Sequence, residues 1–174
     1  NAYTNVQVDT WSAVWDVAEV SDIQIAGNDT KKYTGLSYAG VEFTSKTIDA
    51  TTMDYYHVDI WTPDATNFGV KLVDFGADGA FGGGDDVESQ LDFTPAKNGW
   101  VSYDIKLSDF TSLTKRAHLA QMLFLGTGST LYVDNVYFYN TLLPINLTDF
   151  KVTRKNNTAF LEWTTSFEQN NKGF

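Results

Sequence analysis

Apolar and polar residues alternate over short runs along most of the chain. These runs recur at intervals of roughly 8 to 12 residues, and Gly, Pro, Asn or Asp residues that suit turns lie between them. Helix patterns are nearly absent, and only residues 108–118 allow one helical turn, with Ser108 or Asp109 as its N-cap. The pattern therefore predicts an all-β sandwich or barrel. The predicted strands cover residues 5–8, 13–19, 22–26, 33–44, 55–61, 68–75, 87–93, 100–107, 119–125 and 130–139.

Residues 54–63, DYYHVDIWTP, show the alternation clearly. Successive side chains of a strand point to opposite sides, so Tyr56, Val58 and Ile60 share one side, which we expect to face the core. The opposite side is too polar for a core and too aromatic for an ordinary solvated surface. It carries Tyr55, His57, Asp59 and Trp61.

The charge of the chain limits its partners. The 174 residues include 12 Lys and Arg against 22 Asp and Glu, which gives a formal charge of −10 at pH 7 and a pI near 4.4. Nucleic acid and anionic membrane surfaces would be repelled, so neither is expected as a partner. The sequence contains no run of about 18 apolar residues, so it gives no sign of a membrane-spanning segment. It also contains no cysteine, which excludes disulfide and thiolate chemistry. A neutral ligand, or an anionic ligand bridged by a metal ion, is more compatible with this negative charge than nucleic acid or an anionic membrane.

Aromatic residues make up 15 % of the chain, including five Trp. Sugar rings present apolar C–H faces and a rim of hydroxyls, so flat aromatic rings and polar side chains such as Asp, Gln and Lys can hold them. The combination predicts a saccharide groove, although Trp11 and Trp15 as core plugs at the sandwich edge are an open alternative. Tyr55, His57, Asp59 and Trp61 form the expected floor, and Trp11, Trp15, Trp100, Lys71 and Gln121 are the candidate walls. Further polar side chains on neighbouring strands are Gln90, Asp92 and Asp104.

Carboxylates gather in and beside the glycine-rich segment GADGAFGGGDDVE, residues 76–88. Calcium prefers carboxylate and carbonyl oxygens, and glycines allow a backbone to turn its carbonyls inward. The spacing is not that of an EF-hand, so a long solubilising hairpin loop is an equal alternative. The candidate calcium ligands here are Asp74, Asp78, Asp85, Asp86 and Glu88.

Asp134 is a second candidate calcium ligand, because it interrupts the apolar strand LYVDNVYF. A buried carboxylate needs a cation or a hydrogen-bond donor. The alternative is a β-bulge that turns Asp134 and Asn135 outward. Both interpretations are open at the level of the sequence.

The sequence offers little for catalysis. His57 and Asp59 are neighbours on one strand face, but acid–base or nucleophilic chemistry needs a matched third group that nothing in the sequence marks out. The motifs G-x-S-x-G and H-E-x-x-H and a glycosidase-type carboxylate pair on one strand are absent. We expect no catalytic residue and a structural, hydrogen-bonded role for His57.

The organisation of the chain changes at LLPIN, residues 142–146. The following segment, LTDFKVTRKNNTAFLEWTTS, predicts a hairpin with its turn at residues 155–157. Two strands cannot form an independent sandwich, so we expect one domain over residues 1–141 and the start of a second over 142–174. Because Asn1 opens within a strand-like pattern, we expect the chain to be part of a longer protein.

Five segments of the first domain together resemble a known family: NAYTNVQVDTWSAVW, YYHVDIWTP, VKLVDFGADGAFGGGDDVE, WVSYDIKLSDF and LYVDNVYFY. They are similar to the non-catalytic modules appended to secreted polysaccharide-degrading enzymes of marine Bacteroidota, notably family-16-type laminarinases and β-glucanases. The resemblance covers about residues 1–140. It implies an antiparallel β-sandwich jelly roll in which one concave sheet holds a glycan. It also implies a structural Ca²⁺ near an Asp of the last strand, a position that Asp134 matches.

The tail resembles the opening of the Ig-like or fibronectin-like segment that precedes a C-terminal sorting signal of the type IX secretion system. The motifs that carry this resemblance are LP, L-x-x-F, L-x-W-x-T and E-x-N-N-K-G-F. The resemblance implies a multidomain parent protein that is secreted or displayed on the cell surface.

We expect a non-catalytic module that binds polysaccharide and targets an attached glycoside hydrolase to algal glycan. A neutral β-1,3-glucan such as laminarin suits the acidic chain best, whereas a cluster of Lys71, Lys106 and Arg116 would favour a sulfated or uronate polymer. Agar, porphyran and alginate are open as alternative ligands. A jelly-roll lyase or hydrolase that uses His57 is a second hypothesis, and a structural spacer covered by the next domain is a third.

Overall fold

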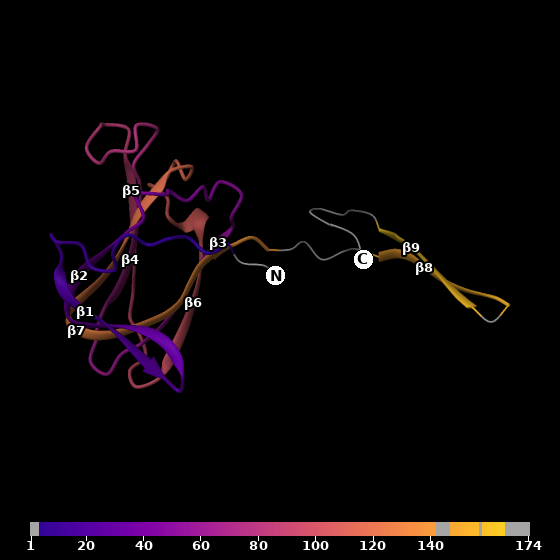
Figure 1. Ribbon diagram of the computed structural model, residues 1–174, viewed down its shortest axis with the longest axis horizontal. Coiled ribbons are helices and arrows are strands. Elements are labelled where there is room, and N and C mark those ends of the chain that lie inside the picture. The colour runs from indigo at the N-terminus through magenta and orange to yellow at the C-terminus, as the bar shows by residue number, and fades with distance from the viewer. Residues whose placement is uncertain (1–3, 142–146, 157, 166–174) are drawn as a thin grey trace. The chain divides into compact units, whose positions relative to one another are not determined.

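The chain forms two compact units, Asn1–Asn140 and Thr141–Phe174 (Figure 1). The computed structural model describes residues 4–141, 147–156 and 158–165. Within them the regular structure is antiparallel β-strand apart from one short 3₁₀ helix, which confirms the all-β prediction. The described residues include no helix long and apolar enough to cross a membrane.

Seven strands form one antiparallel sheet in the described part of the first unit. The strand order is β1-β2-β7-β3-β6, and β4 pairs with both β7 and β5. The elements are β1 (Val17–Ile25), β2 (Asn28–Glu42), β3 (Tyr55–Trp61), β4 (Phe68–Asp74), β5 (Val87–Phe93), β6 (Trp100–Lys106), η1 (Leu107–Asp109) and β7 (Leu119–Tyr139).

Strands β2 and β7 are long enough to belong to two layers of a sandwich. The first residues of β7 pair with β4 and its last residues pair with β3, while β2 runs beside both parts. One layer therefore has the order β5-β4-β7-β2, and the other has the order β6-β3-β7-β2-β1. The register between β2 and β7 shifts on both sides of Leu36, and such irregularities bend a sheet.

A hydrophobic core fills the space between the two layers. Tyr56, Val58 and Ile60 of β3 are fully buried in it, as the alternation in DYYHVDIWTP predicts. Phe68 of β4 contacts Tyr103 of β6 across the sandwich, with ring centroids 5.5 Å apart. Burying side chains of this size supplies most of the free energy that holds the layers together.

Several predicted strands differ from the observed ones. Residues 5–8 form no strand, because backbone pairing with β2 begins only where Asp9 N–H donates to Glu42 O (2.8 Å). Residues 13–16 form a turn rather than the start of a strand, and 17–25 is one strand. Residues 119–125 and 130–139 belong to one strand, because the intervening GTGS forms an irregularity within β7 instead of a turn.

The predicted helical turn exists as η1, one residue earlier than expected. Its N-cap is Lys106, which makes no side-chain cap hydrogen bond. The prediction that Ser108 or Asp109 caps this turn is therefore wrong.

The second unit contains the antiparallel strands β8 (Leu147–Lys155) and β9 (Thr158–Thr165). The hairpin that the sequence predicts is present between them. The LP dipeptide at residues 143–144 and the motif at residues 168–174 lie outside the described residues.

Candidate functional site

The predicted site residues separate onto the two outer surfaces of the sandwich. The outer surface of β5, β4, the start of β7 and the end of β2 is here named the Trp15 face. The outer surface of β6, β3 and the end of β7 is named the His57 face. Trp15, Lys71 and Gln121 belong to the Trp15 face, and Tyr55, His57, Asp59, Trp61 and Trp100 belong to the His57 face.

Strand register arranges the Trp15 face in three rows that cross four strands. Adjacent strands lie about 4.8 Å apart, so neighbours within a row are close enough to act on one ligand. The first row holds Tyr38, Leu125, Gly69 and Asp92; the second holds Gly40, Leu123, Lys71 and Gln90; the third holds Glu42, Gln121, Val73 and Glu88.

Trp15 reaches this face from the turn before β1. Ala13 N–H donates to Gly40 O (3.0 Å), and Gly40 N–H donates to Asp16 Oδ2 (3.2 Å), which fixes the turn along β2. The Trp15 indole occupies the space where a side chain at position 40 would stand, so only glycine fits there. Its Nε1–H donates to Glu42 Oε1 (3.2 Å), and 43 % of the residue remains exposed.

Tyr38 lies beside Trp15 in a nearly parallel orientation. The two ring centroids are 6.3 Å apart with an interplanar angle of 17°. Tyr38 is 36 % exposed, and the partly exposed Leu123 and Leu125 lie next to it on β7. Together these side chains form a largely apolar platform with aromatic surface open to solvent.

Polar side chains surround the platform and hold one another in place. Lys71 Nζ lies 2.9 Å from Glu88 Oε1 on the neighbouring strand. Gln121 Nε2–H donates to Glu42 Oε1 (3.0 Å), the same oxygen that accepts from Trp15. At the other edge, Asp92 accepts from Gln90 (3.0 Å) and from Asn67 (3.1 Å). Such paired donors and acceptors suit vicinal hydroxyl groups.

The His57 face is built from three strands in four rows. These rows are Lys106, Tyr55 and Tyr139; Asp104, His57 and Tyr137; Ser102, Asp59 and Asp134; and Trp100, Trp61 and Tyr132. Register shifts between β3 and β7 next to Asp59, where Asn135 adopts a φ of 50°. This geometry corresponds to the β-bulge alternative for Asp134 and Asn135.

His57 is the centre of a hydrogen-bonded network on this face. It is only 8 % exposed, its Nδ1 lies 2.7 Å from Asp104 Oδ1, and its Nε2 lies 3.3 Å from Asp59 Oδ1. The hydrogen bonds from His57 and Tyr139 lower the pKa of Asp104, because they stabilise the carboxylate. Partial burial and the bond to Asp104 raise the pKa of Tyr139 to about 12.

The remaining groups of the network use their hydrogen-bonding capacity on one another. Ser102 Oγ–H donates to Asp59, and Asn135 Nδ2–H donates to the other oxygen of Asp59 (2.7 Å). Ser102 is bonded to Asp59 and not to His57, so Ser102, His57 and Asp59 do not have the order of a Ser–His–Asp relay. The arrangement fits a structural role for His57 better than acid–base chemistry.

Most rings on the His57 face pack in pairs, whereas Trp100 on the same face is 46 % exposed. Tyr55 and Tyr139 lie 5.1 Å apart at 15°, and His57 and Tyr137 lie 4.5 Å apart at 15°. Trp61 meets Tyr132 edge to face at 5.1 Å. These pairs are closer than the 6.3 Å that separates Trp15 from Tyr38.

Trp11 lies on neither face. It packs against the core, its carbonyl accepts from Tyr33 Oη–H (2.8 Å), and Lys31 Nζ lies 4.9 Å from its ring centroid. Trp11 therefore corresponds to the core-plug alternative, whereas Trp15 does not.

The carboxylates of the glycine-rich loop bind its backbone. Buried Asp74 accepts from Gly76 N–H (2.9 Å) and His118 N–H (2.7 Å). Asp78, Asp85 and Asp86 accept from the N–H groups of Ala80 (2.9 Å), Ala77 (2.8 Å) and Gly82 (2.5 Å) respectively. These bonds hold the loop in shape.

Calcium at this loop stays a prediction. No three Asp, Glu, His or Cys side chains gather to hold a metal within the part of the chain that the structure describes. Asp85 Oδ1 and Asp86 Oδ1 are buried and have no hydrogen-bond partner among the described residues, which is the feature that fits a cation. Asp134 accepts from Asn28 and from Asn135 N–H (2.7 Å), so its carboxylate already has donors.

The fold is similar to that of carbohydrate-binding modules. A family 11 module from Clostridium thermocellum, in complex with a β-1,3-1,4-mixed-linked tetrasaccharide, has a TM-score of 0.51 and 17 % identity over 71 % of this chain and 84 % of its own. The family 30 module of a cellulosomal cellulase of Clostridium thermocellum has a TM-score of 0.57 and 13 % identity over 75 % and 86 %. A module specific for non-crystalline cellulose has a TM-score of 0.50 and 18 % identity over 70 % and 80 %.

These likenesses show the fold of the chain, an antiparallel β-sandwich of the jelly-roll type. The sequence matches no protein-family model, and no curated protein matches it.

Sequence reasoning missed Tyr38 and Glu42 on the Trp15 face. Counting in twos from Leu36 places both on the core side, whereas counting from Tyr33 or Ala39 places them outward, so alternation alone gives no single answer for β2. The available signal was Gly40 between them, since an alternate-position glycine in a strand marks a close approach by another group.

Proposed function

We propose that this chain is a non-catalytic module that binds polysaccharide on the Trp15 face. The observation that carries the proposal is the pair of parallel, exposed rings of Trp15 and Tyr38, rimmed by hydrogen-bonding side chains. A sugar ring stacked there gains apolar contact, and its hydroxyls reach Lys71, Gln90 and Gln121. This moves the expected groove from the His57 face to the opposite surface.

The proposed ligand is a neutral β-glucan, with β-1,3-glucan such as laminarin as the first choice. Glu42, Glu88 and Asp92 lie on the Trp15 face and disfavour a polyanionic main chain there. Solved structures of this fold include one bound to a β-1,3-1,4-mixed-linked tetrasaccharide and one specific for non-crystalline cellulose, which supports a β-glucan. Agar, porphyran and alginate are the competing ligands in the test.

Affinity electrophoresis of the 174-residue chain in gels containing each polysaccharide tests the proposal. We expect laminarin to retard the native chain, and Trp15→Ala to weaken binding by about tenfold or more, because aromatic anchors dominate such surfaces. Trp100→Ala is the matched control, since Trp100 is 46 % exposed against 43 % for Trp15 but lies on the His57 face.

The opposite result, in which Trp100→Ala loses laminarin binding and Trp15→Ala keeps it, would place the site on the His57 face. If no polysaccharide retards the native chain, the spacer hypothesis replaces the binding module. New reducing ends or unsaturated uronate absorbance after incubation with laminarin, agarose or alginate would establish the enzyme hypothesis instead.

We also propose Asp85 and Asp86 as the carboxylates of a structural calcium site, supported by their unpartnered buried oxygens. Loop carbonyls would complete the oxygen ligands that Ca²⁺ prefers.

An attached glycoside hydrolase, Bacteroidota origin and export by the type IX system are likewise proposals. They rest on the resemblance of residues 1–140 and of the tail motifs to those families. Sequencing the complete reading frame tests the hydrolase and the sorting signal together.

A further inference from the structure

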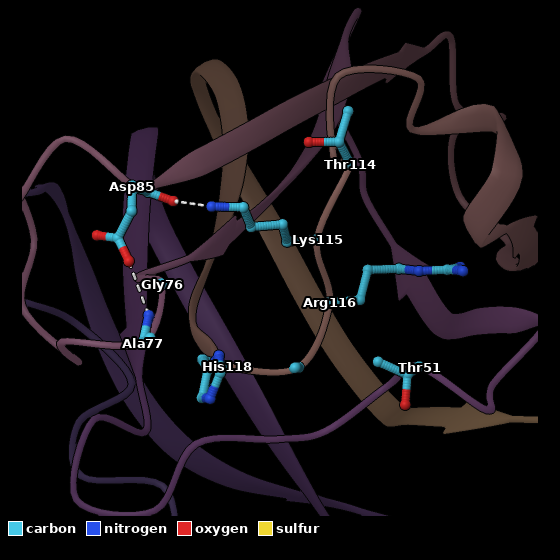
Figure 2. Close-up of a pocket in the computed structure, with 9 residues that line it drawn as sticks. Thr51, Gly76, Ala77, Asp85, Thr114, Lys115, Arg116 and His118 are labelled. Carbon is cyan, nitrogen blue, oxygen red and sulfur yellow. Dashed lines mark hydrogen bonds between the residues drawn. The ribbon is translucent and has the colours of Figure 1, made fainter.

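A cavity of about 440 Å³ lies beside the glycine-rich loop, outside the Trp15 face (Figure 2). Asp85, Gly76 and Ala77 lie on one side of it in this view, and Thr51 and Arg116 lie on the other. The complete lining is Thr51, Gly76, Ala77, Asp85, Thr114, Lys115, Arg116, Ala117 and His118.

Backbone hydrogen bonds fix the walls of this cavity. Asp74, fully buried at the end of β4, joins Gly76 to His118 through their N–H groups. On the far side Ala50 N–H donates to Arg116 O (2.8 Å), which ties the segment before β3 to the segment before β7. The cavity is thus formed before any ligand binds, which lowers the entropic cost of binding.

The lining is basic in an acidic chain. Three of its side chains, Lys115, Arg116 and His118, come from the run KRAH, against the single carboxylate of Asp85. That carboxylate accepts Ala77 N–H (2.8 Å), and Lys115 Nζ–H donates to the Asp85 carbonyl (3.2 Å) across the mouth of the loop. At physiological salt, charges beyond about 8 Å are screened, so these local groups outweigh the net charge of the chain.

The cavity adjoins the end of the Trp15 face. Gln121 and Val73 form a pair in the third row of that face, and the next pair along the same strands is Leu119 with Asp74. Gly76 and His118 of the cavity lie within two residues of that pair. A glycan chain that follows β4 and β7 across the face therefore arrives at the cavity.

We propose that this cavity binds an anionic group, a sulfate ester or a carboxylate, carried by a sugar residue of the glycan held on the Trp15 face. Lys115 and Arg116 pair with the anion, and the hydroxyls of Thr51 and Thr114 are available to the sugar that carries it. The inference rests on the proposed function, and it narrows the ligand to a neutral main chain with acidic substituents. The cluster of Lys71, Lys106 and Arg116 considered from the sequence does not form, because the three residues lie on the Trp15 face, the His57 face and in this cavity.

Calorimetric titration of the native chain with laminarin and with laminarin sulfate tests the proposal. We expect the sulfated polymer to bind at least about fivefold more tightly, and Lys115→Gln combined with Arg116→Gln to abolish that preference while laminarin affinity stays unchanged. Lys106→Gln, an exposed lysine of the His57 face, is the matched control and retains the preference. Amide chemical shifts with glucuronate, glucose and inorganic sulfate as separate probes locate the contact at residues 114–118.

Three results would overturn the inference. They are equal affinities for the two polymers, a preference that survives the double substitution, and the absence of shifts at residues 114–118 with both inorganic sulfate and glucuronate. The proposed function fails separately, by absence of laminarin binding or by full binding in Trp15→Ala. Both proposals are supported if Trp15→Ala loses binding to laminarin and to laminarin sulfate, and if only the Lys115 and Arg116 substitutions remove the preference for the sulfated polymer.

Discussion

The spacing of paired rings distinguishes the two outer faces at the scale of single residues: 6.3 Å for Trp15 and Tyr38, and 4.5 to 5.1 Å for the stacked pairs of the His57 face. Trp15 lies over a glycine and keeps nearly half of its surface exposed, whereas Tyr55 and His57 stack on Tyr139 and Tyr137. A ring packed more closely on its neighbour offers less surface to a sugar, and Trp100, 46 % exposed on the His57 face, is the ring that the control substitution tests. Composition alone therefore identifies aromatic surfaces but does not say which one is open.

His57 is expected to stabilise the fold without contributing to glycan binding. His57→Ala removes the partner of Asp104 and Asp59 and leaves two carboxylates close together, so we expect a loss of about 2 kcal/mol in the free energy of unfolding. The melting temperature should fall by about 4 to 8 °C. Circular dichroism melts measure it, with laminarin affinity at a temperature where the variant is folded as the second readout.

His57→Gln is the matched substitution, because an amide can still donate to Asp104 and should recover part of the stability. A His57→Ala variant as stable as the native chain, or one that is stable but no longer binds glycan, would contradict the structural role.

Strand β2 shows how far the sequence predicts the candidate site. Along β3 strict alternation holds, so Tyr56, Val58 and Ile60 are buried as predicted. Along β2 it does not hold: Tyr33, Leu36 and Ala39 are all buried at intervals of three positions, and Tyr38 points outward. Gly35, with a φ of 60°, occupies the irregularity. The register shifts on both sides of Leu36, so the break in alternation stays local, and it depends on pairing with β7 rather than on local sequence.

Two glycines of the glycine-rich loop provide a matched test of how the loop closes. Gly76 and Gly79 have φ angles of 70° and 68°, so alanine at either position costs about 1 kcal/mol in backbone strain. A Cβ at Gly76 would also overlap the Asp85 carboxylate, whereas a Cβ at Gly79 meets nothing within 4 Å. We expect Gly76→Ala to cost at least about 1 kcal/mol more than Gly79→Ala.

Hydrogen exchange at residues 76–86 measures the local opening of the loop in both variants. Faster exchange in Gly76→Ala than in Gly79→Ala is the expected result. Equal exchange would mean that Asp85 does not close the loop.

Calcium at the same loop is expected to stabilise the whole sandwich. A cation that binds only the folded state adds about 2.7 kcal/mol at a hundred times its dissociation constant, or about 5 to 10 °C in melting temperature. Chelation should therefore lower the melting temperature and added Ca²⁺ should restore it. Asp86→Asn should remove the response, while Asp134→Asn, whose carboxylate already has donors, should keep it. An unchanged melting temperature after chelation removes the calcium proposal.

At the scale of the whole molecule, the uneven distribution of charge matters more than its total. The Trp15 face carries three carboxylates and one lysine, while the cavity beside it carries most of the local basic groups. The formal charge of −10 argues for a neutral main chain on that face but gives no indication of the cavity. The run KRAH is visible in the sequence, yet its position beside the glycine-rich loop follows only from the pairing of β4 with β7.

Salt dependence separates the two kinds of contact in the intact chain. Stacking on Trp15 and Tyr38 and hydrogen bonds to uncharged hydroxyls involve no ion pairing, so laminarin affinity should change less than about twofold between 50 mM and 500 mM NaCl. Contacts of Lys115 and Arg116 with sulfate groups are screened, so the extra affinity for laminarin sulfate should decrease steadily over the same range. Duplex DNA is the control polyanion, and it should not bind at either salt concentration. The acidic chain and the DNA backbone repel each other, and a cavity that holds one anionic group cannot offset that repulsion. Laminarin binding that weakens strongly with salt, or retention of DNA, would show that charge and not stacking holds the ligand, and it would contradict the assignment of the Trp15 face.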